Sequence, residues 1–248
     1  MNINNLYEHE FMKHLRVLLQ DQLFIMIESC PERGIRKKDD YIETTSAEYV
    51  RTVFEKFSNL MNTIEQLEYI PIFIQRFPLQ KFYNENGINN ENYIKYHLEN
   101  HFLKVSSILD QSIILVNEVH NLGIPTRRTS LSQLKENKHT KDAPSINVLK
   151  AFEKGVQGIK SMRNKITHRG EFNDYELNEL SKNNFFNKIS DKTDGKLNLL
   201  NYSKLEMNNV VKNKLEFLEK NNKEIVRIIY LLFEALEVEF KYKLEEIN

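Results

Sequence analysis

The stretch SINVLKAFEKGVQGIKSMRNKITHRG, residues 145–170, combines a clear helical pattern with a chemically distinctive group of side chains. Its apolar residues recur at spacings of three and four: Ile146, Leu149, Phe152, Val156, Ile159, Met162 and Ile166. Such spacing is typical of a helix with one buried face. Pro144 and Ser145 are a start signal, and Gly170 is a stop signal because glycine readily adopts the left-handed conformation that follows many helices. The sequence therefore predicts one helix over 145–169.

Three polar side chains near the end of this predicted helix suggest chemistry on an anion. Asn164 and His168 are four residues apart and share a face, whereas Arg163 lies about 140° around the helix from His168 at ~100° per residue. They would flank one groove that holds a permanently charged guanidinium, an amide and an imidazole able to exchange protons near neutral pH. No carboxylate lies between Arg163 and Gly170 in the sequence. A phosphodiester is the simplest substrate for this arrangement.

The pattern R-N-x-x-x-H, followed by Arg169-Gly170 at a helix end, resembles the signature of HEPN domains (higher eukaryotes and prokaryotes nucleotide-binding). The resemblance covers residues 89–248 and implies an all-α antiparallel helical bundle. It also implies a metal-independent endoribonuclease without a cofactor, of the kind found in toxin–antitoxin and phage-defence systems. By the same resemblance, His168 would be the general acid or base for attack of an RNA 2′-hydroxyl on its adjacent phosphate, giving 2′,3′-cyclic phosphate ends. Arg163 would stabilise transition-state charge, and Asn164 would orient His168 or hold a phosphate oxygen.

The resemblance extends to partners and to regulation. HEPN enzymes usually form their site across a two-fold dimer, so we expect a C2 homodimer whose motif helices face each other. Members of the superfamily often carry an acidic or hydroxyl residue on the helix facing the motif. Asp110 is our candidate for this assisting role and Glu118 the second choice, the alternative being a solvent-facing aspartate. Gly170 stands where HEPN toxins silenced by nucleotidylation carry tyrosine, so control by an antitoxin or another regulatory protein is expected instead.

The chain has no net charge, but its cations are unevenly distributed. Residues 125–170 contain eleven Lys or Arg and three Asp or Glu, a local balance of +8. Such a field could steer RNA onto the motif. The candidate RNA-binding residues are Lys160, Lys165, Arg169, Arg127 and Arg128. The alternative is a solvated loop and helix face.

Several features bear on location and on metal binding. Cys30 is the only cysteine, so no intrachain disulfide can form, and the N-terminus lacks the basic and apolar runs of a signal peptide. The longest apolar run, residues 228–233, is too short to cross a bilayer. A cytoplasmic protein without membrane attachment is therefore expected. His97 and His101 are four residues apart but have no third ligand in sequence, so no metal site is expected.

The remaining sequence predicts helices separated by short connections. Apolar spacing indicates helices over 11–28, 45–68, 91–121, 174–186 and 204–243. Pro71 and Pro78 favour an extended segment over 69–79, the basic residues 127–141 favour a mobile loop, and 190–196 reads as a loop. A polar turn at 84–90 is the predicted boundary between an N-terminal helical region, 1–88, packed on the bundle, and the bundle itself, 89–248.

Two other functions are compatible with the same residues. One is a catalytically silent HEPN-like module that binds a nucleotide, RNA or protein as an adaptor. The other is an all-helical dimerisation protein in which Arg163 and Asn164 are ordinary exposed residues and His168 caps a helix end.

Overall fold

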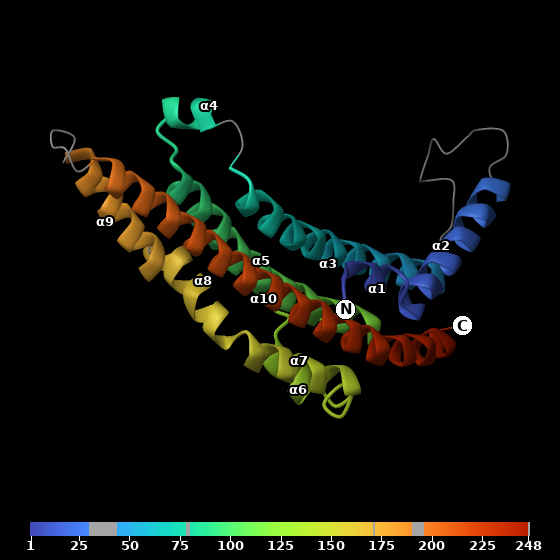
Figure 1. The fold of residues 1–248 in the computed structure, drawn as a ribbon. Coiled ribbons are helices and arrows are strands. Elements are labelled where there is room, and N and C mark those ends of the chain that lie inside the picture. The colour runs from blue at the N-terminus through green and yellow to red at the C-terminus, as the bar shows by residue number, and fades with distance from the viewer. Residues whose placement is uncertain (30–43, 78–79, 171, 190–195, 248) are drawn as a thin grey trace. The chain divides into compact units, whose positions relative to one another are not determined.

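The computed structural model describes residues 1–29, 44–77, 80–170, 172–189 and 196–247 (Figure 1). These ranges form helices and contain no strand, which confirms the predicted all-α class. The helices are α1 (Ile3–Tyr7), α2 (Glu10–Ser29), α3 (Thr45–Gln75), α4 (Gln80–Glu85), α5 (Asn90–Val119), α6 (Leu131–Glu136), α7 (Pro144–Gly155), α8 (Gln157–Arg169), α9 (Tyr175–Ile189) and α10 (Lys196–Ile247). None of the described helices is both long and apolar enough to cross a lipid bilayer.

The chain forms two compact units. The first contains Met1–Glu65, Ser107–Gly155 and Ile225–Asn248, and the second contains Gln66–Ser106 and Val156–Glu224. The divisions fall within α3, α5 and α10 and between α7 and α8. All three motif residues belong to the second unit. The domain boundary expected at residue 88 stays a prediction.

Aromatic side chains form much of the core of the first unit. The ring of Phe11, on α2, lies with its centroid 5.8 Å from that of Phe57, 5.7 Å from Phe233 and 5.8 Å from Phe240. Tyr49 stacks on Phe240 with its centroid 5.5 Å away, and its hydroxyl donates to the Val119 carbonyl at 2.7 Å. The fully buried phenylalanines each remove a large apolar area from water, so α2, α3 and α10 pack as the apolar spacing predicted.

The second unit is built on the first part of α5. Ile94 and Leu98 are buried there, and the ring of Phe102 lies 5.7 Å from Phe172. The hydroxyl of Ser181, on α9, donates to the buried Glu91 carboxylate at 2.6 Å. The helices predicted at 91–121, 174–186 and 204–243 are confirmed by α5, α9 and α10. Residues 190–195 of the predicted loop, and Cys30, lie outside the described residues.

The expected extended segment over 69–79 is wrong for residues 69–75, because α3 continues through Pro71 to Gln75. A proline inside a helix removes the hydrogen bond to the carbonyl four residues earlier, here that of Leu67. The Asn222 side chain supplies the missing donor, since its Nδ2 lies 3.3 Å from the Leu67 oxygen in a buried position. Ile70 and Ile74 are also buried. Pro78 lies outside the described residues.

The expected mobile loop over 127–141 is wrong in its centre, where α6 forms. Ser130 caps this helix by accepting a hydrogen bond from the Gln133 amide at 3.3 Å. Leu131 and Leu134 are buried, and the Thr140 hydroxyl donates to the Leu134 carbonyl at 2.6 Å. The turn predicted at 84–90 is shorter than expected because α4 extends to Glu85. Both helices are short, and their apolar pattern was masked by the charged residues around it.

Candidate functional site

The stretch predicted as one helix over 145–169 is two helices, so that prediction is wrong at its centre. α7 ends at Gly155, and Val156 leaves helical geometry with φ −101° and ψ 11° before α8 begins. Glycine has a low helix propensity, and Gly155 and Gly158 flank the break. The outer ends agree with the prediction: α7 begins at Pro144, and Gly170 follows α8 with a left-handed φ of 64°.

The predicted buried face also ends at this break. Ile146, Leu149, Phe152 and Val156 are buried, whereas α8 contains no buried residue. Ile159, Met162 and Ile166 of α8 are only partly covered. α8 is therefore an amphipathic helix whose apolar stripe remains partly open within one chain.

The motif occupies the second half of α8. Asn164 and His168 are exposed and Arg163 is half-buried, with its Nη1 donating to Asn164 Oδ1 at 3.4 Å. The Thr167 hydroxyl donates to the Arg163 carbonyl at 2.9 Å, and the Gly170 amide donates back to α8 carbonyls to close its last turn. The imidazole of His168 is thus presented to solvent from the final helical turn.

Four cations at the C-terminal end of α8 are not paired with a described acid. Among the described residues, no carboxylate forms an ion pair with Arg163, Lys165, His168 or Arg169. The guanidinium and the imidazole are therefore available to an anionic ligand. This agrees with the absence of acidic residues from the motif sequence.

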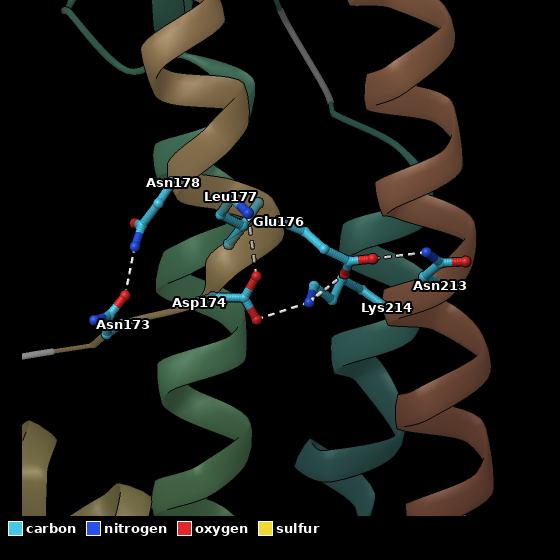
Figure 2. Close-up of polar contacts among 7 residues, drawn as sticks. All are labelled: Asn173, Asp174, Glu176, Leu177, Asn178, Asn213 and Lys214. Atoms are coloured by element: carbon cyan, nitrogen blue, oxygen red, sulfur yellow. Dashed lines mark hydrogen bonds and ion pairs between the residues drawn. The ribbon is translucent and has the colours of Figure 1, made fainter.

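The start of α9 is anchored by a lysine from α10 (Figure 2). Lys214 Nζ lies 2.7 Å from Asp174 Oδ2 and 2.6 Å from Glu176 Oε2. Asp174 Oδ1 accepts from the Leu177 amide at 3.1 Å and so caps α9, while Asn213 Nδ2 donates to Glu176 Oε1 at 2.7 Å. These contacts hold the start of α9 on α10 within the second unit.

Electrostatics and burial both act on this cluster. Burial acts to lower the pKa of Lys214, but its hydrogen bonds to Asp174 and Glu176 outweigh burial and the pKa is raised. The hydrogen bond from Lys214 lowers the pKa of Glu176. Lys214 and Glu176 are therefore both charged at neutral pH. Sequence analysis missed Lys214, because Asp174 is 40 positions away and no local pattern connects them.

A comparison with family models identifies the family of this chain. The model of the Cthe2314-like HEPN family matches residues 49–241, which include the whole of α8 and the Lys214 cluster. The chain belongs to the Cthe2314-like HEPN family. Searches of curated proteins and of solved structures found no match. The HEPN resemblance drawn from the motif is confirmed at the level of the family, and the roles of individual residues stay predictions.

The other residues predicted for the HEPN site are divided between the two units. Lys160, Lys165 and Arg169 lie on α8 with the motif. Arg127 and Arg128 are exposed between α5 and α6 in the first unit. Asp110 is exposed on the part of α5 that belongs to the first unit, and the assisting role assigned to it, or to Glu118, stays a prediction.

His97 and His101 of this HEPN chain are core residues. The His97 ring stacks on Phe73 with centroids 5.2 Å apart and meets the edge of Tyr93 at 4.5 Å. His101 is fully buried, neither of its nitrogens has a hydrogen-bond partner among the described residues, and burial lowers its pKa to about 4. In the described ranges, no group of three or more His, Cys, Asp or Glu side chains is arranged to hold a metal ion.

Proposed function

We propose that this HEPN protein is a metal-independent endoribonuclease whose site is Arg163, Asn164 and His168 on α8. The observation that carries the proposal is the presentation of the R-N-x-x-x-H residues from the last turns of a solvent-exposed helix in a chain of the HEPN family. None of the described carboxylates pairs with Arg163 or His168. RNA supplies both the anion and the internal nucleophile that such a site needs.

The reaction divides between the motif side chains. His168, as general base, removes the proton of a 2′-hydroxyl, whose oxygen then attacks the adjacent phosphorus atom. The bond from phosphorus to the 5′-oxygen breaks, and that oxygen takes a proton from a general acid. The products are a 2′,3′-cyclic phosphate and a 5′-hydroxyl. Arg163 stabilises the additional negative charge on the phosphoryl oxygens, and Asn164 holds His168 or a phosphate oxygen.

A second copy of the chain would complete the site. Ile159, Met162 and Ile166 form the partly open apolar stripe of α8, and burying this stripe against its equivalent across a two-fold axis would bring two motif helices together. Such a C2 homodimer supplies two imidazoles, one as base and one as acid. It also doubles the number of guanidinium groups around the phosphate.

Cations of α8 extend this site along an RNA backbone. Lys160, Lys165 and Arg169 would contact phosphates next to the cleaved one, and Arg127 and Arg128 would add to the attraction of RNA. The biological role that fits such an activity is that of a toxin or phage-defence effector, held inactive by an antitoxin or regulatory protein.

The test is RNA cleavage in EDTA by the wild type, His168→Ala and Arg163→Ala, with transfer, ribosomal and messenger RNA as substrates. His139→Ala is the matched control, because His139 is an exposed histidine of the first unit. We expect cyclic phosphate ends from the wild type and the control, and a loss of at least ~100-fold in both motif variants. Binding of RNA without cleavage by the wild type would favour the silent adaptor. Cleavage that survives both motif substitutions would place the site elsewhere.

A further inference from the structure

The C-terminal part of α10 has two apolar faces, and only one of them is packed. Phe233 and Phe240 are fully buried in the core of the first unit. On the opposite face of the helix, Leu231, Val238 and Tyr242 are 43%, 70% and 66% exposed. We call these three residues the outer stripe of α10. Large apolar side chains left open along one helix face are typical of a surface that contacts a partner.

A pocket of about 510 Å³ lies beside this stripe. Val238 and Tyr242 belong both to the outer stripe and to the lining of the pocket. Other lining residues come from the end of α5, with His120 and Leu122, and from the connection after α6, with His139. All of them lie in the first unit. The outer stripe and the pocket form one surface, the α10 groove, and the pocket is large enough for a long side chain.

Glu239 holds the elements around the pocket together. Its Oε2 lies 2.9 Å from His120 Nε2, and its Oε1 accepts a hydrogen bond from the Ser145 amide at 3.0 Å. The Glu239 and His120 side chains are only 9% and 15% exposed, so water competes little for these contacts. One carboxylate therefore ties α10 to the end of α5 and to the first turn of α7. A pocket fixed in this way needs little rearrangement to receive a ligand.

The helix that carries the outer stripe is acidic. Residues 231–247 contain five glutamates and two lysines, a balance of −3. Both lysines already pair with glutamates of the same helix, at 2.6 and 2.8 Å. Glu234 and Glu245 are exposed, and none of the described cations forms an ion pair with either. This charge repels RNA and attracts a basic partner, and a second copy of the chain would bring two segments of the same sign together.

We propose that the α10 groove binds a basic amphipathic helix of a partner protein. Apolar side chains of that helix, at spacings of three and four, cover the outer stripe, and lysines or arginines beside them pair with the exposed glutamates. One long basic side chain enters the pocket, where Val238 and Tyr242 contact its stem and Glu246 its charged end. The groove belongs to the first unit and the motif to the second, and the proposal does not depend on the ribonuclease function.

The experiment selects binders from a displayed library of helical peptides, with the wild-type chain as the target. Each peptide carries leucine at the a and d positions of about three heptads, and its flanking positions are randomised among arginine, lysine, glutamate, glutamine and serine. We expect arginine and lysine to be enriched over glutamate in the selected peptides. Selection of acidic peptides, or of no peptide, would overturn the proposal.

Two groove variants then locate the binding site of a selected peptide. Val238→Ser shortens the outer stripe, and Glu246→Arg reverses a charge in the pocket; both side chains are exposed, so the core stays intact. We expect Kd, measured by fluorescence anisotropy, to rise at least ~10-fold in each variant. Tyr175→Ser is the matched control, because Tyr175 is 77% exposed on α9 in the second unit. An unchanged Kd in both groove variants would place the peptide elsewhere and refute the assignment.

Sedimentation of the chain without peptide tests the other occupant of the groove. Self-association that Val238→Ser abolishes would show that a second copy covers the outer stripe, and the proposal would fail. Self-association that Val238→Ser leaves unchanged agrees with the proposal. The RNA cleavage assay is independent of both measurements: a wild type that binds basic peptides in the groove but does not cleave RNA would refute only the ribonuclease function.

Discussion

The side chain of Asn222 takes the place of the backbone donor that Pro71 lacks, and its contribution to stability can be measured. The Leu67 carbonyl would ordinarily accept from the amide of residue 71, but receives Asn222 Nδ2 at 3.3 Å instead. Asn222 is 3% exposed and Leu67 is 1% exposed, so water does not offer an alternative partner. Replacing Asn222 with leucine keeps a similar size and leaves the carbonyl without a donor.

The size of the effect follows from this geometry. An unsatisfied buried carbonyl costs about 1–3 kcal/mol, and a 3.3 Å bond is longer than average, so Asn222→Leu should lower the free energy of unfolding by about 1–2 kcal/mol. Pro71→Ala restores the amide donor to Leu67 and should stabilise α3 by about 1–3 kcal/mol. In the Pro71→Ala background, Asn222→Leu should lower the free energy of unfolding by less, with a coupling energy of about 1 kcal/mol between the two positions.

The assay is urea unfolding of the wild type, both single variants and the double variant, followed by far-ultraviolet circular dichroism. The double-mutant cycle cancels the hydrogen bond that Asn222 also makes to Glu68, because that bond is lost in both backgrounds. Asn221→Leu is the control: its amide bonds the exposed Phe217 carbonyl at 2.9 Å, so it should not couple to Pro71. Additive effects of Pro71→Ala and Asn222→Leu would refute the reasoning.

Two further predictions concern stability. His101 stays neutral in the folded chain down to about pH 4, whereas in the unfolded chain it binds a proton near pH 6.5. The contribution of neutral His101 to the free energy of unfolding is therefore fully present above pH 6.5 and is lost as the pH falls towards 4. Between pH 7 and pH 5 the wild type should lose about 2 kcal/mol of stability through His101, and His101→Phe should not show this loss. Urea unfolding at pH 7 and at pH 5 measures the difference, and an unchanged pH dependence in the variant would contradict the burial argument. Gly170→Ala should cost about 1 kcal/mol, because a Cβ there meets no atom within 4 Å and only the left-handed backbone is strained. Gly155→Ala is the control because φ is not positive there, and it should show no such cost in thermal unfolding. Equal costs in the two variants would mean that the left-handed backbone at Gly170 is not their cause.

Local patterns explain where sequence analysis succeeded. The end of α8 at Gly170 and the long helices α5 and α10 were predicted because capping residues and apolar spacing act over a few residues. The HEPN signature was found in the same way, since Arg163, Asn164 and His168 lie within six consecutive residues. The break at Val156 could have been suspected from Gly155 and Gly158, but the continuous apolar spacing outweighed them.

The sequence by itself therefore determined the all-α class, the long helices α5 and α10 and the family signature, because each depends on neighbours along the chain. Only the tertiary structure decided that α3 continues through Pro71, since the compensating donor lies 155 positions from Leu67. It also decided that α8 is a helix without a fully buried residue and that Lys214 anchors the start of α9. These features depend on groups that only folding brings together, and the spacing of residues along the sequence does not show which distant groups will meet.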